Sequence, residues 1–245
     1  AYENGYNIIT CQSSESYQKE LANIKTLIKS KVDGILLSVS KKTYKHDHVR
    51  EIHQRGIPIV MFNRILHDLN ISKVCVDDCK GAYQIVRYLS QCGHRKIAHI
   101  SGPLNLQLSR DRKQGYTDAL HDGGLKVFPE YLAEGDFTPD SGYKITRQLL
   151  QLKELPDAIF CTCDAMAFGC IKYLKNHGFR IPQDIAVVGF TDEPFAELVD
   201  PTLTTISQPA YDIGRNAADL LIKELESASP SYKPETKVLS TKFVM

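Results

Sequence analysis

The stretch Asp184-Ile-Ala-Val-Val-Gly-Phe-Thr-Asp-Glu-Pro194 decides the fold that the sequence predicts. Residues 185–190 form a short, nearly all-apolar run, which is typical of a parallel strand buried on both faces. The run ends abruptly in polar residues, among them Thr191 and Asp192. Ligands of open α/β sheets bind just beyond the carboxyl ends of the strands. This loop is therefore a candidate for ligand recognition as well as a marker of the fold.

The same rhythm of strand and helix runs along the whole chain. Apolar runs predict strands at residues 6–11, 32–37, 56–62, 74–76, 93–100, 131–135, 158–161, 185–190, 203–206 and 237–245. Apolar residues at helical spacing predict helices after a Ser13-Ser14 cap and at residues 49–55, 81–92, 110–122, 140–150, 165–177 and 212–226, the last broken by residues 227–231. Alternating strands and helices indicate an α/β fold of doubly wound parallel sheets.

The pattern restarts at Ser101-Gly-Pro103, which indicates two lobes of similar design. We expect an N-terminal lobe of residues 1–101 with 208–232. The C-terminal lobe is then residues 102–207 with 233–245. Residues 1–5 are expected to be the last turn of a helix, because Gly5 suits the left-handed position that ends helices.

The amino-acid composition is typical of an ordinary globular protein. The 245 residues are 42% hydrophobic and 24% charged, with a formal net charge of +1. No basic run gives an electrostatic footprint for nucleic acid, and no apolar run is long enough to span a bilayer. Seven scattered cysteines favour a reducing compartment over a disulfide scaffold. These properties predict a soluble, cytoplasmic protein that does not bind a membrane.

An ordered set of motifs resembles a known family. They are Val32-Asp-Gly-Ile-Leu-Leu, Gly56-Ile-Pro-Ile-Val, Gly93-His-Arg-Lys-Ile-Ala-His-Ile-Ser-Gly-Pro, Gly115-Tyr-Thr-Asp-Ala-Leu, Asp164-Ala-Met-Ala-Phe-Gly, Ile181-Pro-Gln-Asp-Ile-Ala-Val-Val-Gly-Phe and Leu203-Thr-Thr-Ile-Ser-Gln-Pro. Together they are similar to the effector-binding domain of the lactose-repressor/galactose-repressor (LacI/GalR) family of bacterial transcription regulators.

The resemblance implies a fold like that of periplasmic sugar-binding proteins, with two lobes, three crossovers and a ligand in the cleft between them. It also implies a helix-turn-helix domain and a hinge helix, neither of which is in this chain. The first strand and most of the first helix of the N-terminal lobe are missing too. Since that strand would be an interior one, we expect a slot in the sheet.

The resemblance places ligand-contacting residues at strand ends. The matching positions here are Ser38, Asn63, Val76, Arg112 and Phe137. A guanidinium offers a fixed fork of donors for hydroxyls or a carboxylate, and an aromatic face suits the C–H side of a sugar ring. Arg112 could instead form a surface salt bridge, and Phe137 could be an ordinary core aromatic.

Two departures from the family pattern concern further site residues. Cys163-Asp164 stands where Asn-Asp is common, and Thr191 stands where Asp is common, with Asp192 next. Either the effector is not a typical hexose, or Asp192 and Asp164 replace the lost contacts. Asp164 could instead cap a helix, and Asp192 could cap the turn before Pro194. Gln208 matches a residue at the lobe junction, where it could hold the backbone or touch ligand.

No sequence pattern supports a metal, a cofactor or catalysis. Cys161, Cys163 and Cys170 lie in or near apolar segments, where free cysteines behave as small hydrophobes, and no second pair completes a zinc site. The loop at residues 45–48 is polar and is expected to be exposed. Nucleophile-elbow, phosphate-loop and zinc-protease motifs are absent from the sequence.

The leading hypothesis is an effector-sensing domain of a transcription regulator that is not an enzyme. The resemblance implies that it binds a small molecule, a sugar or sugar derivative, acts as a homodimer, and contacts operator DNA through a domain outside this chain. A periplasmic sugar-binding protein of a transporter is the alternative. An α/β enzyme has only the fold class in its favour.

Overall fold

The structure is a computed structural model, and it describes residues 2–227 and 232–245. The chain divides into two units. Unit 1 comprises Ala1–Val76 and Pro209–Leu239, and unit 2 comprises Asp77–Gln208 and Ser240–Met245. The chain therefore passes between the units three times, after Val76, Gln208 and Leu239.

The division falls earlier than the expected boundary at Ser101. Helix α3 (Asp78–Gln91) packs against α4 (Gln107–Asp122), and strand β4 (Ile97–Ser101) lies inside the sheet of unit 2. Residues 77–101 therefore share a core with the residues that follow them. At the other end, residues 233–239 belong to unit 1, because strand β9 (Thr236–Leu239) pairs with strand β3 (Ser72–Val76).

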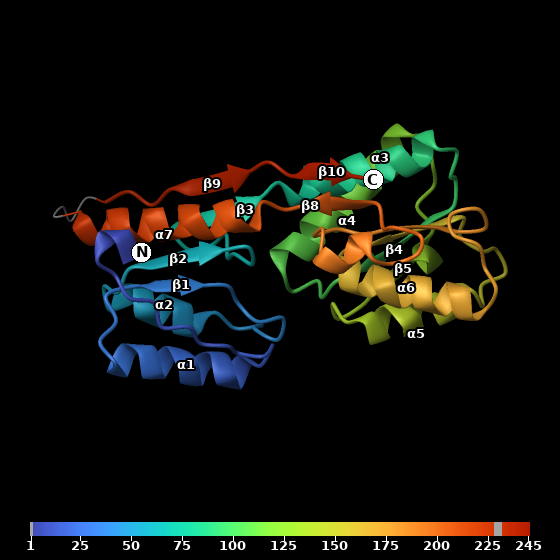
Figure 1. The fold of residues 1–245 in the computed structure, drawn as a ribbon. Coiled ribbons are helices and arrows are strands. Elements are labelled where there is room, and N and C mark those ends of the chain that lie inside the picture. The colour runs from blue at the N-terminus through green and yellow to red at the C-terminus, as the bar shows by residue number, and fades with distance from the viewer. Residues whose placement is uncertain (1, 228–231) are drawn as a thin grey trace. The chain divides into compact units, whose positions relative to one another are not determined.

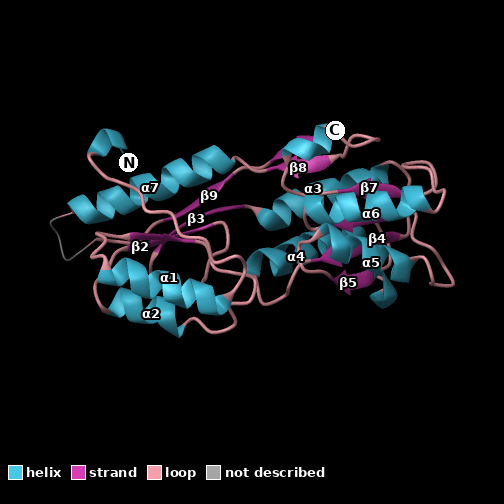
Figure 2. Ribbon diagram, turned by 60° about the horizontal axis from the view of Figure 1, so that its bottom comes forward, coloured by secondary structure: helices cyan, strands magenta, loops and turns pink. Residues whose placement is uncertain are grey.

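Unit 1 is built on a parallel sheet of four strands in the order β1-β2-β3-β9, in which β1 is Ile35–Leu37 and β2 is Ile59–Phe62. Helices α1 (Tyr17–Lys29) and α2 (Asp47–Gln54) lie on one side of it, and α7 (Ala210–Glu226) lies on the other (Figures 1 and 2). Helix α7 buries Ile213, Ala217 and Leu220 against the sheet, as its helical spacing predicts.

The first residues of unit 1 differ from the prediction. Residues 6–11 form no strand, and Ile8 and Ile9 are 75% and 59% exposed. Residues 5–9 and 30–36 line a cavity of about 420 Å³ beside α7, where the sequence predicted a slot in the sheet. A strand is formed by hydrogen bonds to a neighbour, and residues 6–11 form no backbone ladder with any other described residue. Gly5 is left-handed at φ 77°, as expected, after a short 3-10 turn η1 (Tyr2–Asn4).

Two local details of unit 1 correct the sequence prediction. Helix α1 is capped by Ser16, whose hydroxyl accepts a hydrogen bond from the Lys19 N–H, and not by Ser13-Ser14. Ser14 instead has a positive φ of 48° in the preceding turn. The loop at residues 45–48 is not wholly exposed, because His48 is buried in the first turn of α2.

Unit 2 has a parallel sheet in the order β5-β4-β6-β7, with β5 Leu132–Glu134, β6 Ala158–Cys161 and β7 Ala186–Val188. Side chains of β4 alternate between two cores. Ile97 faces α3 and α4, while Ala98 and Ile100 face α5 (Pro139–Leu149) and α6 (Asp164–Asn176). Both faces are apolar because helices cover both, as in a doubly wound sheet.

The predicted strand at residues 237–245 is in fact two strands. Strand β9 lies in unit 1, whereas β10 (Lys242–Val244) pairs antiparallel with β8 (Thr205–Ser207) in unit 2. Phe243 of β10 packs against the α3–α4 core and forms an edge contact with Tyr88. Two short 3-10 segments, η2 (Pro129–Tyr131) and η3 (Pro194–Glu197), complete unit 2.

Helix α7 ends at Glu226 with Ser227 as its C-cap. Most of the predicted break at residues 227–231 lies outside the described residues. In the part of the chain that the structure describes, no helix has both the length and the apolar character needed to cross a membrane.

Candidate functional site

The candidate site residues of unit 2 follow the carboxyl ends of its parallel strands. Phe137 follows β5, Cys163 and Asp164 follow β6, and Thr191 and Asp192 follow β7. Parallel strands end at the same edge of a sheet, which is where ligands of α/β proteins bind. In unit 1, Ser38 and Asn63 follow β1 and β2 at the corresponding edge, and Val76 ends β3.

Arg112 is the centre of a buried network. Its Nε and Nη2 lie 2.8 Å and 2.6 Å from Asp78 Oδ1, and its Nη1 donates to the Thr162 carbonyl at 2.5 Å. The guanidinium carbon lies 3.8 Å from the ring centroid of Phe190. Only 2% of Arg112 is exposed, so a surface salt bridge is the wrong interpretation. Burial raises the pKa of the Asp78 carboxyl, and the Arg112 charge opposes that shift.

Asp164 joins three segments and caps no helix. It is the first residue of α6, and the N-cap position belongs to Cys163, whose side chain makes no capping bond. The Asp164 carboxylate accepts hydrogen bonds from Thr205 Oγ1 at 2.6 Å and from the Glu193 N–H at 2.8 Å. It is fully buried, and burial raises its pKa despite these bonds. Asp164 thus fixes the loop after β7 to β8.

The close approach of Asp164 explains why residue 189 is a glycine. A Cβ at residue 189 would lie 2.1 Å from Asp164 Oδ1 and 3.0 Å from Leu203. Any larger residue would therefore push the Asp164 carboxylate away from Thr205. The glycine is needed for this close approach, since its own φ is not left-handed.

The loop of residues 191–193 is conformationally strained. Thr191 and Asp192 have φ values of 136° and 61°, which non-glycine residues rarely adopt. The Thr191 N–H donates to the Ile206 carbonyl at 2.8 Å, and its Oγ1 is buried without a hydrogen-bond partner among the described residues. Glu193, the next polar residue of this loop, is half-buried, and burial raises the pKa of its carboxyl.

Phe137 is half-buried, in a left-handed backbone conformation with φ 66°, and packs in part against the α5–α6 core. Its ring would lie 2.2 Å from a Cβ placed on Gly102, which is why the Ser-Gly-Pro turn after β4 carries a glycine. The Ser109 hydroxyl abuts the same point of Gly102. Phe137 is therefore partly a core residue, as the alternative interpretation held, and it also borders the strand-end turn.

Two buried hydroxyls in this region have no partner. Ser109 and Thr162 are both fully buried, and neither Oγ atom has a hydrogen-bond partner within the described ranges. A buried polar group that is left unpaired costs free energy, so such groups in native proteins call for an explanation such as a ligand. Sequence reasoning missed both residues, because serine and threonine carry no motif at these positions.

The three neighbouring cysteines are apolar packing residues, as predicted. Cys161, Cys163 and Cys170 are buried and free, with Cys161 Sγ and Cys170 Sγ 3.3 Å apart. Burial raises the pKa of the Cys163 thiol to about 11, so it stays protonated at neutral pH. Among the described residues there is no group of three or more potential ligands placed to hold a metal ion.

Gln208 is the last residue of unit 2 before the second passage between units. Its side chain is half-buried, and its Nε2 is buried without a hydrogen-bond partner in the described part of the chain. No side-chain bond from Gln208 to the backbone of the passage is formed. The two interpretations of this residue, backbone support and ligand contact, both remain predictions.

The three ligand-contacting residues predicted in unit 1 lie at the ends of strands β1, β2 and β3. Val76 is 6% exposed and belongs to the core formed with α7. Asn63 has a left-handed φ of 56°, and its N–H donates to the Val74 carbonyl at 2.9 Å. Ser38 is half-buried at the end of β1. A ligand role for each of the three stays a prediction.

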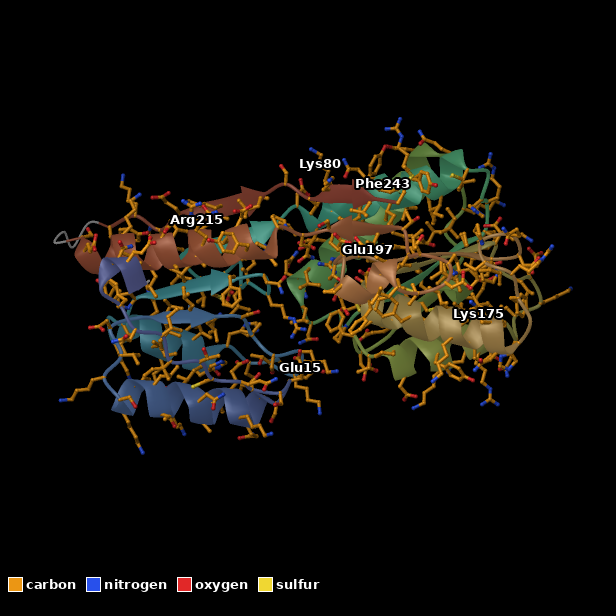
Figure 3. The ribbon with its side chains drawn as sticks, viewed as in Figure 1. Glu15, Lys80, Lys175, Glu197, Arg215 and Phe243 are labelled. Atoms are coloured by element: carbon orange, nitrogen blue, oxygen red, sulfur yellow. The ribbon has the colours of Figure 1, made fainter. Side chains whose placement is uncertain are left out.

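Two glutamates hold the loop that follows Ser38. The buried Glu20 carboxylate accepts from the Ser40 N–H at 2.6 Å and lies 2.8 Å from His48 Nε2. Glu15, labelled in Figure 3, accepts from the Lys41 N–H at 2.7 Å and pairs with Arg64 at 2.7 Å. The composition of residues 45–48 gave no sign of this arrangement, because the partners of His48 lie far away in sequence.

Known proteins resemble this chain over most of its length. A family model for the periplasmic binding protein-like domain matches residues 86–245. The chain is 36% identical over 226 residues to the HTH-type transcriptional repressor CytR of Escherichia coli K12, covering 92% of this chain and 66% of that protein. A solved regulatory protein of the LacI family from Chloroflexus aggregans has a TM-score of 0.82 and 30% identity, covering 92% of this chain and 80% of that chain.

The chain belongs to the LacI/GalR family. A solved complex of the transcriptional regulator CelR with cellobiose is also similar to it, with a TM-score of 0.87 and 31% identity over 94% of this chain and 70% of that chain. The α/β fold predicted from the motifs is confirmed by these likenesses. This LacI/GalR chain spans about two thirds of the length of the first curated relatives that it matches. Its relatives are repressors, so the transporter alternative is not favoured.

Proposed function

We propose that this chain is the effector-sensing domain of a transcription regulator and that it binds a small ligand, a sugar or a sugar derivative. The observation that carries the proposal is the strand-end cluster of unit 2. There Arg112 and Asp164 fix three segments in place, while the buried hydroxyls of Ser109 and Thr162 lack partners. Preorganised polar groups of this kind are typical of small-molecule sites.

A sugar is favoured by chemistry and by likeness. Sugars supply many hydroxyls, each of which can donate and accept, and Phe137 borders the site with an aromatic ring. The similar regulator CelR forms a complex with cellobiose. We propose that Phe137, Asp192, Thr191, Gln208 and the remaining N–H groups of Arg112 contact the ligand, as do Ser38, Asn63 and Val76 of unit 1.

We further propose that ligand binding changes the DNA affinity of the whole protein. A ligand alters an equilibrium only when it binds one conformation better than the other, and that difference sets the size of the allosteric effect. The repressors that resemble this chain support operator DNA as the partner. A homodimer would hold two DNA-reading modules for two half-sites. We infer a cytoplasmic protein without enzymatic activity.

Thr162→Val tests the proposal. Valine keeps the shape of threonine and removes only the unpartnered hydroxyl, so the free protein should be as stable as the wild type or more so. Titration calorimetry with a panel of free pentoses, hexoses, disaccharides and nucleosides should find a binder for the wild type. The valine variant should bind that compound about tenfold more weakly, the cost of one lost hydrogen bond. Unchanged affinity, or no binding by the folded wild type, would contradict the proposal.

A further inference from the structure

The strand-end cluster of unit 2 holds an excess of negative charge. One guanidinium, that of Arg112, is accompanied by four carboxylates, those of Asp78, Asp164, Asp192 and Glu193. The formal charge of the cluster is therefore −3. These charges lie close together. The charges of Arg112, Glu193 and Asp164 all affect the pKa of the Cys163 thiol, and the charge of Asp192 raises the pKa of Asp164.

The single positive charge is already neutralised. Arg112 forms a buried ion pair with Asp78, whose side chain is only 7% exposed, through two of its nitrogens. Its third nitrogen donates to the Thr162 carbonyl. An anionic ligand would therefore meet no unpaired cation from this cluster. It would have to separate Arg112 from Asp78 and leave a buried carboxylate without its partner, which is costly.

Two carboxylates of the cluster are available to a ligand. Asp192 and Glu193 are half-buried, and neither carboxylate has a hydrogen-bond or ion-pair partner among the residues described. Asp164 holds the backbone of their loop by accepting from the Glu193 N–H. Burial, with the nearby Asp164 charge, raises the pKa of Glu193. A hydrogen-bond donor beside this carboxylate would stabilise its charged form, and a second anion would destabilise that form further.

Independent groups indicate that a ligand belongs here. The hydroxyls of Ser109 and Thr162 are fully buried and have no hydrogen-bond partner among residues 2–227 and 232–245, and Thr162 is joined to Arg112 through its carbonyl. The Phe137 ring borders the same turn as Ser109. Hydroxyls accept and donate equally well and carry no charge, so they suit a neutral polyhydroxyl compound.

We propose that the effector carries no negative charge: it presents hydroxyl or amine donors to Asp192 and Glu193, and compounds bearing phosphate or carboxylate are excluded. This inference rests on the proposed function, because it concerns the ligand of the same site. The loop after β7 would discriminate between neutral and anionic ligands. A ligand anion placed against these carboxylates would be repelled, so anionic compounds should bind much more weakly than neutral ones.

The experiment compares matched ligands by titration calorimetry. Glucose, ribose, cellobiose and adenosine are each measured against glucose 6-phosphate, ribose 5-phosphate, cellobionate and adenosine 5′-monophosphate. The compound that binds the wild type should bind at least about a hundredfold more tightly than its anionic counterpart. An anionic compound that binds more tightly than its neutral partner overturns the inference and leaves the proposed function standing. No binding by any compound, with the protein folded, contradicts the proposed function itself and the inference with it.

Two variants test whether Asp192 and Glu193 cause the discrimination between neutral and anionic ligands. Asp192→Asn and Glu193→Gln remove charge and keep shape, so each should weaken the neutral ligand about tenfold and reduce the discrimination against its anionic counterpart. Glu197→Gln removes the same charge from an exposed residue of η3 (Figure 3) and should change neither value. Discrimination that is unchanged in both loop variants would overturn the assignment.

Discussion

Arg112 and Asp78 form a buried ion pair that joins α4 to the first turn of α3, with Nη2 and Oδ1 2.6 Å apart. The bond lies two residues after the first passage between the units, which follows Val76. Helices α3 and α4 also approach each other closely, since a Cβ at Gly115 would lie 2.1 Å from the Cys79 carbonyl oxygen. The residue expected to bind ligand directly therefore also fixes the start of a helix.

Removal of one partner of this pair should be severely destabilising. Asp78→Ala leaves the Arg112 charge buried and uncompensated, so we expect a loss of about 3–5 kcal/mol in the free energy of unfolding. Urea denaturation measures it. The control is Glu51→Ala, which breaks the exposed Arg55–Glu51 pair and should cost less than about 1 kcal/mol. Equal losses in the two variants would show that the buried pair has no special role.

The close approach at Gly189 gives a second prediction. Gly189→Ala places a methyl group 2.1 Å from Asp164 Oδ1, and we expect a loss of about 1–3 kcal/mol from the displaced carboxylate. Ligand affinity should fall too, because the loop of residues 191–193 depends on Asp164. Gly214→Ala is the matched control. It lies inside α7 with nothing within 4 Å of its Cβ position, so alanine should raise stability by up to about 1 kcal/mol.

The positions of most strands and helices along the chain were predictable because their signals are local. Apolar runs such as residues 158–161 and the helical spacing of Ile213, Ala217 and Leu220 depend on residues close in sequence. Residues 6–11 show the limit of this reasoning. Their composition suits a strand, but a strand exists only where a neighbour accepts its hydrogen bonds, and composition does not supply the neighbour.

The site was predictable in position and less so in role. Motif spacing placed Arg112 and Asp164 near the strand ends, but their partners Asp78 and Thr205 are 34 and 41 residues away in sequence. Such pairings follow from tertiary packing. Glu193 was predicted only as one polar residue of the loop after β7, because no single-residue property reveals its partial burial next to Asp164.

Thr162 adjoins the Arg112–Asp78 ion pair, and its side chain gives a prediction about stability. Its carbonyl accepts from Arg112, and its side chain is the hydroxyl tested by Thr162→Val. We expect Thr162→Val to leave unfolding in urea unchanged or shifted to higher concentration, since the folded state loses only an unsatisfied group. A drop in stability of more than about 1 kcal/mol would show that the hydroxyl has a structural partner. Thr202→Val, the same substitution at an exposed residue, serves as the control for the measurement.

His99 predicts how stability depends on pH. It is fully buried between the rings of Tyr116 and Phe160, with centroids 5.0 Å and 4.8 Å away, and Nδ1 lies 3.1 Å from the Phe160 carbonyl oxygen. Burial lowers its pKa from 6.5 to about 4, and the positive charges of Lys113 and Arg112 add to the shift. The unfolded chain therefore binds a proton between these values while the folded chain does not.

Stability should consequently fall as the pH is lowered through the range from 6.5 to 4. A shift of one pKa unit corresponds to about 1.4 kcal/mol, so the folded protein should lose about 2 kcal/mol through His99 between pH 7 and pH 5. Urea unfolding of His99→Gln should show a smaller loss over this interval by that amount, whatever its stability at pH 7. His121→Gln is the control, because His121 is exposed. Parallel pH profiles for wild type and His99→Gln would mean that His99 takes up its proton in the folded state as readily as in the unfolded chain.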